Sequence, residues 1–171
     1  MEKKEKERLL KALYSTNDQS ILNALETIEK KGSSVFTKPM IELLKTTQNK
    51  DLKTKVLQMF RHLKNQTAGE IIADSLPDIN AGEIQKELVS ACWMNGLDYS
   101  GKLNIFVEVF SNQKFETAFE AYTVITNTPL EKLSEVELSA LYEKAKKCLH
   151  DSSELKQNTA EDLCEYFYRG I

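Results

Sequence analysis

Histidine and cysteine side chains are the first candidates for chemistry, and their spacing argues against a metal site or a catalytic nucleophile. The histidines His62 and His150 lie 88 positions apart, and neither belongs to an HxxxH pair. The cysteines Cys92, Cys148 and Cys164 form no CxxC pair. A zinc site needs such ligands to converge. We therefore expect no metal and no cofactor, and we interpret Cys92 as a small core residue and all three cysteines as reduced thiols.

Trp93 and Asp98 are a second candidate, because an aromatic ring and a carboxylate are groups that a base-excising site uses. Such a site also needs cationic walls to hold the nucleic-acid strand. The positive charges nearest to Trp93 are Lys86 and Lys102, with carboxylates interleaved, and the net charge is -3. No GxGxxG or GxxxxGK phosphate loop is present. Nucleic acid is therefore not the expected partner. Trp93 either anchors another partner or fills a gap between helices.

Polar residues of both charge signs recur at helical spacing and form the third set of candidates. We expect them to line the concave face of a helical array, where mixed charge suits a protein segment better than a polyanion. A solvated face without a ligand is the alternative. Together with Trp93, the candidate partner-binding residues are Lys38, Glu42, Lys45, Glu70, Asp74, Trp93, Lys102, Asn104 and Glu108.

The elements that must position these residues are helices. Only three Pro and six Gly interrupt the chain, and the apolar residues recur at helical spacing without the alternation of strands. We expect a first helix at about residues 4–14 and a last helix at about 153–169. The chain between them, residues 17–150, indicates about four helical hairpins, which gives about ten helices in all.

Two columns of apolar residues recur along the expected hairpins at steps of 32, 31 and 31 residues. We expect both columns to be buried between neighbouring units, as the stacked faces of a repeat array are. The first column is Leu25, Leu57, Leu88 and Phe119, and the second is Ile28, Phe60, Ala91 and Tyr122.

Helix ends follow the same division. Glycine or asparagine is expected in the left-handed conformation just past a helix end, and such residues stand at Gly32, Asn65, Gly96 and Asn127. A polar residue with an acid three positions later can form a capping box where the next helix begins. The pairs with this spacing are Thr67 and Glu70, Asn80 and Glu83, and Ser134 and Glu137.

The repeat resembles a HEAT-repeat or HEAT-like solenoid. Its most typical stretch is NKDLKTKVLQMFRHLKN, residues 49–65, and the resemblance covers roughly residues 17–150. It implies an all-α, right-handed α-α superhelix of the armadillo type, with residues 1–171 as one domain. A capping helix at residues 1–15 and another at 153–169 would close its ends.

The resemblance also implies a function. HEAT-like arrays generally act as non-enzymatic scaffolds that hold a protein or peptide on the concave face formed by the second helices. A minority are enzymes, and the alternative is a DNA-binding enzyme of the alkylpurine DNA glycosylase type. The resemblance favours binding over catalysis without selecting a ligand.

The composition of the chain indicates where in the cell the protein is expected. Hydrophobic residues make up 41% and charged residues 29% of the chain, as in ordinary soluble proteins. No apolar run is long enough to span a bilayer, and the N-terminus lacks the apolar core of a signal peptide. With its reduced cysteines, the chain is expected to be cytoplasmic and free of membranes.

Three consecutive aromatic residues, Tyr166, Phe167 and Tyr168, stand near the C-terminus. They cannot all face one side of a helix, so at least one is expected to be exposed or to cover another chain. We expect either a homodimer through this helix or an ordinary capping helix.

Overall fold

The computed structural model describes residues 2–80, 82–150 and 154–170, and over these ranges it is α-helical with no strand. Residues 1, 153 and 171, which the expected terminal helices and domain include, lie outside the described residues. The all-α prediction is confirmed. The α-helices are α1 (Lys3–Leu13), α2 (Asp18–Lys31), α3 (Thr37–Thr46), α4 (Lys50–Arg61), α5 (Gln66–Ser75), α6 (Glu83–Asn95), α7 (Leu103–Asn112), α8 (Phe115–Thr126), α9 (Glu135–Lys146) and α10 (Glu154–Tyr168). Short 3-10 turns are η1 (Ser34–Phe36), η2 (Leu76–Asp78), η3 (Ser100–Lys102) and η4 (Lys147–His150).

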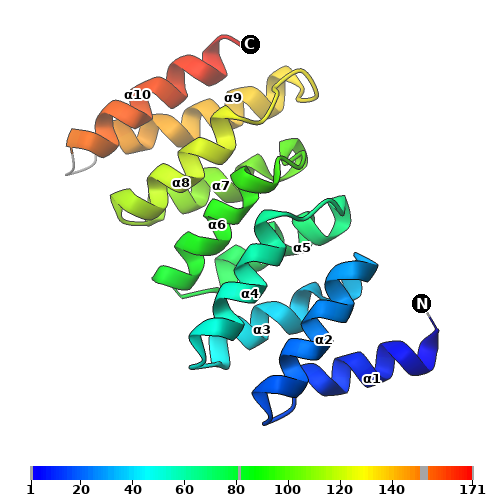
Figure 1. Ribbon diagram of the computed structural model, residues 1–171. Coiled ribbons are helices and arrows are strands. Elements are labelled where there is room, and N and C mark those ends of the chain that lie inside the picture. Colours follow the sequence, from blue (N-terminus) through cyan, green and yellow to red (C-terminus); the bar gives the residue numbers. More distant parts are fainter. Residues whose placement is uncertain (1, 81, 151–153, 171) are drawn as a thin grey trace.

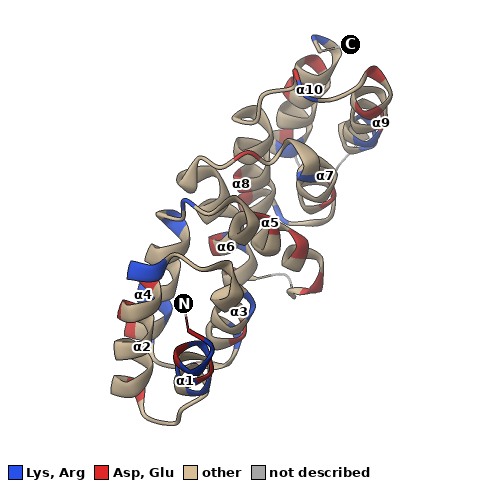
Figure 2. Ribbon diagram, turned by 90° about the vertical axis from the view of Figure 1, so that its right-hand side faces the viewer, with Lys and Arg blue, Asp and Glu red and all other residues tan. Residues whose placement is uncertain are grey.

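The helices stack in two rows, which Figures 1 and 2 show from two directions. The even row contains α2, α4, α6, α8 and α10, and each of these helices packs against its neighbours in that row. The odd row contains α1, α3, α5, α7 and α9, which pack in the same way. The chain alternates between the rows, so its N-terminus and C-terminus lie at opposite ends of the stack. This arrangement is an α-solenoid.

The closest packing between consecutive helices is shifted by one helix from the expected hairpins. Helix α7 packs extensively on α8, and α9 on α10, whereas α6 and α7 pack less closely. The connections follow the same pattern, because only two residues, 113 and 114, separate α7 from α8. The natural pairs therefore begin with an odd-numbered helix. The division of residues 1–171 into one solenoid domain with two capping helices stays a proposal.

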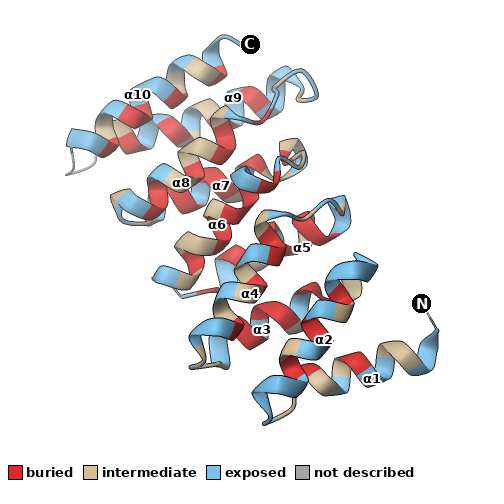
Figure 3. Cartoon of the chain, viewed as in Figure 1, coloured by how far each residue is buried: buried red, intermediate tan, exposed pale blue. Residues whose placement is uncertain are grey.

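The core runs between the two rows as one cluster of buried apolar side chains (Figure 3). Leu25 and Leu88 are fully buried, as the first column predicts, but Leu57 is only half-buried and Phe119 is 45% exposed. The column prediction is therefore wrong at these two positions. In the second column only Tyr122 departs, because it is half-buried.

The predicted column does not follow the repeat of the helices. The residues that precede α2, α4, α6 and α8 are spaced by 32, 33 and 32 positions, whereas the predicted column has steps of 32, 31 and 31. A helix turns by about 100° for each residue, so Phe119, two residues before the buried Ala121, faces away from the buried stripe, and Leu57, one residue after the buried Val56, lies at its edge. The column that the actual steps define is buried throughout: Ala24, Val56, Val89 and Ala121.

The Asn17 side chain accepts a hydrogen bond from the Ser20 backbone N–H at 2.8 Å, which caps α2. Several predicted helix ends are confirmed. Gly32 and Gly96 end α2 and α6 in the left-handed conformation, with φ of 62° and 66°. Ser134 and Glu137 form a reciprocal capping box at the start of α9.

Other predicted helix ends are wrong. Asn65 is not past a helix end but begins α5, where its side chain accepts from the backbone N–H of Ala68, so the Thr67 capping box does not form. Asn127 follows α8 in the right-handed conformation, and Gly82 stands at the start of α6 in place of Asn80. An asparagine amide can cap the start of a helix as readily as its backbone can end one, so its sequence position alone does not decide between them.

Candidate protein-interaction site

The structure places eight of the nine candidate partner-binding residues along the odd row. Trp93 alone lies on α6 in the even row. The other eight are Lys38, Glu42 and Lys45 on α3, Glu70 and Asp74 on α5, Lys102 in η3, and Asn104 and Glu108 on α7. The predicted set therefore divides into a surface on the odd row and one separate aromatic side chain.

A hollow of about 300 Å³ between α3 and α5 gathers half of that surface. Lys38, Glu42, Lys45 and Asp74 line it, and Lys45 Nζ lies 3.0 Å from Glu42 Oε1. The rest of the lining, which the sequence prediction missed, consists of Ile41, Ile71, Ser75, Asp78 and Ile79. Isoleucine side chains beside charges of both signs can accept an apolar side chain of a mixed-charge segment. The isoleucines carry no polar signal by which sequence reasoning could have found them.

A second hollow, of about 320 Å³, adjoins the first on the odd row. Ile79 lines both hollows, and Glu108 is the one predicted residue that lines the second. Ile105 and Val109 contribute apolar surface from α7, and Pro77 contributes from η2. The two hollows therefore extend along the odd row from α3 to α7.

The remaining predicted residues of the odd row contact one another or nearby helices. Lys102 Nζ lies 2.6 Å from Asp74 Oδ1, which ties η3 to α5. Lys144 of α9 pairs with Glu108 at 3.0 Å and also donates to Asn104. Figure 2 shows charges of both signs along this row. These pairs are exposed, so each contributes at most about 1 kcal/mol to stability, and a partner could displace them at small cost.

Ion pairs also join successive helices near the even row, where they form a ladder. Each rung at the N-terminal end links a carboxylate on one helix to a cation on a neighbouring helix. The rungs are Glu5 with Lys31, Glu29 with Lys55, and Arg61 with Glu87, which connect α1 to α2, α2 to α4, and α4 to α6.

Trp93 forms the next rung of this ladder. Its indole Nε1 donates to Glu120 Oε2 at 2.7 Å, which joins α6 to α8. The following pair is again an aromatic residue and an acid, because Tyr122 of α8 and Asp162 of α10 line one hollow. Burial raises the pKa of Tyr122, and the Asp162 carboxylate raises it further. Trp93 thus stands where the earlier rungs have a cation, so its place among polar residues in the repeat has a physical explanation.

Trp93 and Asp98 do line one hollow, of about 310 Å³, together with Cys92, Tyr99 and Lys132. The Asp98 carboxylate is already paired, since Lys132 forms an ion pair with it and the Ser100 backbone N–H donates to it at 2.9 Å. These bonds lower the pKa of Asp98 to about 2, whereas burial raises the pKa of Cys92 to about 12. A thiol so buried is not a nucleophile near neutral pH.

The charges divide unevenly along the chain. Residues 1–65 hold 14 Lys and Arg against 8 Asp and Glu, a net charge of +6. Residues 66–171 hold 9 Lys and Arg against 18 Asp and Glu, a net charge of -9. The hollow that contains Trp93 and Asp98 lies in the negative half, where the field opposes a nucleic-acid strand.

Comparison with known proteins identifies the fold. No protein-family model and no curated protein matches the sequence. Among solved structures, the chain is similar to an archaeal HEAT-like repeats protein from Thermococcus onnurineus NA1, with a TM-score of 0.52, 12% identity, and coverage of 95% of this chain and 70% of that one. The fold is a HEAT-like α-solenoid. A designed armadillo repeat protein (TM-score 0.52, 17% identity, 93% and 80% coverage) and an engineered protein (0.52, 15%, 95% and 78%) are similar to this solenoid as well.

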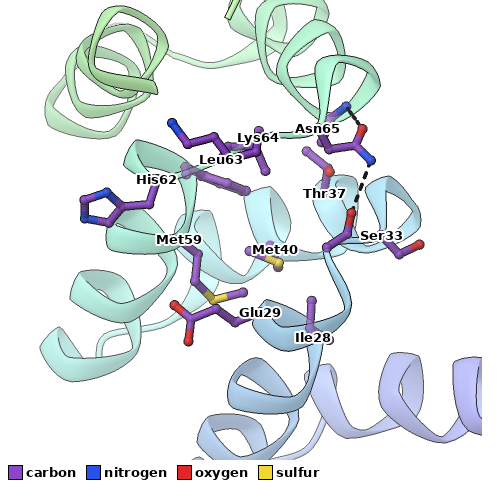
Figure 4. A pocket seen from close by; sticks show the side chains of 13 residues that line it. Ile28, Glu29, Ser33, Thr37, Met40, Met59, His62, Leu63, Lys64 and Asn65 are labelled. Atoms are coloured by element: carbon purple, nitrogen blue, oxygen red, sulfur yellow. Dashed lines mark hydrogen bonds between the residues drawn. The ribbon is translucent and has the colours of Figure 1, made fainter. Parts of the chain in front are cut away.

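A further hollow of the solenoid lies beside the turns that follow α2 and α4 (Figure 4). It measures about 380 Å³ and is lined by apolar side chains that include Ile28, Met40 and Met59. Asn65 Nδ2 donates to the Gly32 carbonyl at 3.2 Å across its edge. Flexible methionine side chains adapt to apolar groups of different shape. This hollow can therefore accept an apolar side chain, and sequence reasoning did not foresee it.

Potential metal ligands and membrane-spanning helices were sought in the part of the chain that the structure describes. His62 points away from Met40 and Met59 in Figure 4, and no group of three or more His, Cys, Asp or Glu among the described residues is arranged to hold a metal ion. No helix in the described ranges is long and apolar enough to cross a membrane.

The C-terminal aromatic residues separate as their helical spacing requires. Phe167 is fully buried, and the half-buried Tyr166 donates its hydroxyl to the Thr128 carbonyl at 2.7 Å. Tyr168 is 68% exposed and lies 6.3 Å from the ring of Tyr142. The predicted exposed aromatic is thus Tyr168, and a homodimer through α10 stays a prediction.

Proposed function

We propose that this solenoid is a non-enzymatic protein-interaction scaffold of the cytoplasm that binds a protein or peptide segment along α3, α5 and α7. The hollow between α3 and α5 is the observation that carries the proposal. Four residues that the sequence predicted surround it: Lys38, Glu42 and Lys45 on α3, and Asp74 on α5. Together with the isoleucine walls, they give the hollow both charged and apolar surface.

The chemistry of the hollow indicates the kind of segment that it fits. Its apolar surface comes from isoleucines of α3, α5 and the residue after η2, and burial of an apolar partner side chain there would supply most of the affinity. The charges at its edge would fix the register of a segment with both acidic and basic residues. We expect an interface that continues into the second hollow beside Glu108.

Affinity capture from the source cell with charge-reversed variants tests the proposal. Lys38→Glu with Lys45→Glu changes two cations at the hollow. Lys50→Glu with Lys53→Glu makes the same change in net charge on α4, in the even row. We expect the first variant to lose polypeptides that the wild type and the control retain, with unchanged helix content by circular dichroism. Identical sets for all three proteins would refute the proposal.

A second candidate is the DNA-binding enzyme of the glycosylase type, because Trp93 and Asp98 line the same hollow. Fluorescence titration with duplex DNA, followed by assay for base release from alkylated DNA, separates the two functions. The negative half of the chain predicts no binding even at low salt. Salt-sensitive binding with base release, lost in Asp98→Asn, would favour the enzyme over the scaffold.

A further inference from the structure

The even-row ladder changes its chemistry between α4 and α8. Up to Arg61 and Glu87, each carboxylate is neutralised by a cation. From α6 onward, the neighbours of the carboxylates are neutral: Trp93 donates to Glu120, and Tyr122 lines one hollow with Asp162. Neither aromatic residue carries a positive charge, so neither compensates the negative charge of its carboxylate. The ladder therefore ends in two such rungs, whose carboxylates can still attract a cation.

Apolar side chains are exposed around these two rungs. Trp93 is 39% exposed, and Met94 and Phe119 are each 45% exposed. The Phe119 ring lies 5.7 Å from Phe115 and 5.7 Å from Tyr122, stacked on the latter. We call this set the aromatic-acidic surface, and its members are Trp93, Met94, Phe115, Phe119, Glu120, Tyr122 and Asp162. An exposed group of large apolar side chains in a soluble protein commonly marks an interaction site.

Cations are scarce on the helices that carry this surface. Helix α8 contains no Lys or Arg, and its other acid, Glu116, has no ion-pair partner among the described residues. The lysine of α10, Lys156, donates to the carbonyls of Ser111 and Gln113. Arg169, which follows α10, lines the hollow that contains Tyr122 and Asp162, but its ion pair is with Glu165. The surface thus combines exposed aromatic rings with unneutralised carboxylates.

We propose that the aromatic-acidic surface binds a cationic amphipathic segment of another protein. Lysine or arginine side chains of the segment would lie between the Glu120 and Asp162 carboxylates and the aromatic rings, whose faces attract cations. Apolar side chains of the segment would cover Met94 and Phe119. This surface lies on the even row, so the proposal adds a second binding site to the one proposed on the odd row.

Trp93 provides the measurement, because it is the only tryptophan in the chain. The probe is a synthetic amphipathic helix of lysine and leucine, and the matched probe has glutamate in place of lysine. We expect the lysine peptide to shift the emission of Trp93, with a Kd that rises as salt is added. We expect the glutamate peptide to leave the emission unchanged.

Two charge-removing variants test the carboxylates. Glu120→Gln with Asp162→Asn removes both charges but keeps an oxygen at residue 120 that can accept from the Trp93 indole, so the bond between α6 and α8 is preserved. We expect the Kd for the lysine peptide to rise about 3- to 10-fold, the range for two exposed ion pairs. Glu26→Gln with Glu131→Gln removes the same charge from exposed positions without an ion-pair partner in the described chain, and its Kd should match the wild type.

Three outcomes would overturn the proposal. Binding of the glutamate peptide with similar affinity would show that charge does not select the ligand. An equal loss in the Glu26 and Glu131 variant would show that only net charge matters. Sedimentation would contradict a binding site for another protein if the wild type alone self-associated and the Glu120→Gln with Asp162→Asn variant did not. The Lys38 and Lys45 variant should bind the lysine peptide at least as tightly as the wild type, so the two sites can fail separately.

Discussion

Leu88→Ala should lower the free energy of unfolding more than Phe119→Ala does, although phenylalanine has the larger side chain. The first apolar column places both residues in the core, and on that basis Phe119→Ala would cost about 3–5 kcal/mol. In the solenoid, Leu88 is fully buried and Phe119 is 45% exposed. We therefore expect Leu88→Ala to be the more damaging change.

The magnitudes follow from burial. Leu88→Ala removes three buried carbon atoms, about 2.4 kcal/mol at about 0.8 per CH₂, and the cavity left behind raises the cost to about 3–4 kcal/mol. Phe119→Ala loses about half of the burial energy of a phenylalanine, roughly 1–1.5 kcal/mol, and opens no closed cavity. Lost contacts with Phe115 and Tyr122 add about 0.5 kcal/mol, which the better helix propensity of alanine offsets by a similar amount. The expected net cost is about 1–1.5 kcal/mol.

Urea unfolding followed by circular dichroism at 222 nm measures both costs, with Trp93 fluorescence as a second probe. Coincident transitions and an unchanged m value would justify a two-state free energy of unfolding, which repeat arrays do not always permit. A cost for Phe119→Ala equal to or above that for Leu88→Ala would refute the assigned register of α8.

Two further predictions concern titratable groups. The pKa of Asp98 falls from its ordinary 3.8 to about 2 on folding, so its ion pair stabilises the protein above about pH 4, and that contribution is lost as the pH falls through about 2. The Asp98→Asn variant lacks this titration, so its stability should fall less between about pH 4 and pH 2 than that of the wild type. The difference should be under about 1 kcal/mol, because the ion pair is exposed. Acid unfolding indistinguishable from that of the wild type would contradict the lowered pKa. Burial raises the pKa of Cys92 to about 12. A disulfide reagent at pH 8 should therefore label the half-buried Cys164 in the native protein, and should react with Cys92 only after unfolding. Mass spectrometry locates the labelled cysteine, and rapid labelling of Cys92 in native buffer would show that α6 is not packed as described.

The helical character and two-row stacking of the chain could be predicted because many residues carry the same signal. Apolar spacing, glycines such as Gly32 and Gly96, and the Ser134 cap all indicate helices joined by turns. The register could not be predicted as well. Steps of 31 and 32 residues both place apolar residues in line, so the sequence does not distinguish the exposed Phe119 from the buried Ala121 two residues later.

The candidate site could be predicted in part. Charged residues on α3 and α5 were found because surface charge is visible in a sequence, whereas Ile41 and Ile71 line the same hollow and resemble core residues. The role of Trp93 depends on Glu120, a residue 27 positions away on another helix. Pairing at that distance depends on how the units stack, and one sequence alone does not contain that information.

The bonds between successive turns have a consequence for how such a chain can diverge. Asn65 reaches the carbonyl of Gly32, and Gln66 accepts from the backbone N–H of Asp98. In each bond one partner contributes only backbone, which every residue possesses. The residue that contributes only its backbone can therefore be substituted without loss of the bond, provided that the backbone conformation stays the same. Drift of this kind is compatible with a shared architecture at 12% identity to the archaeal HEAT-like repeats protein.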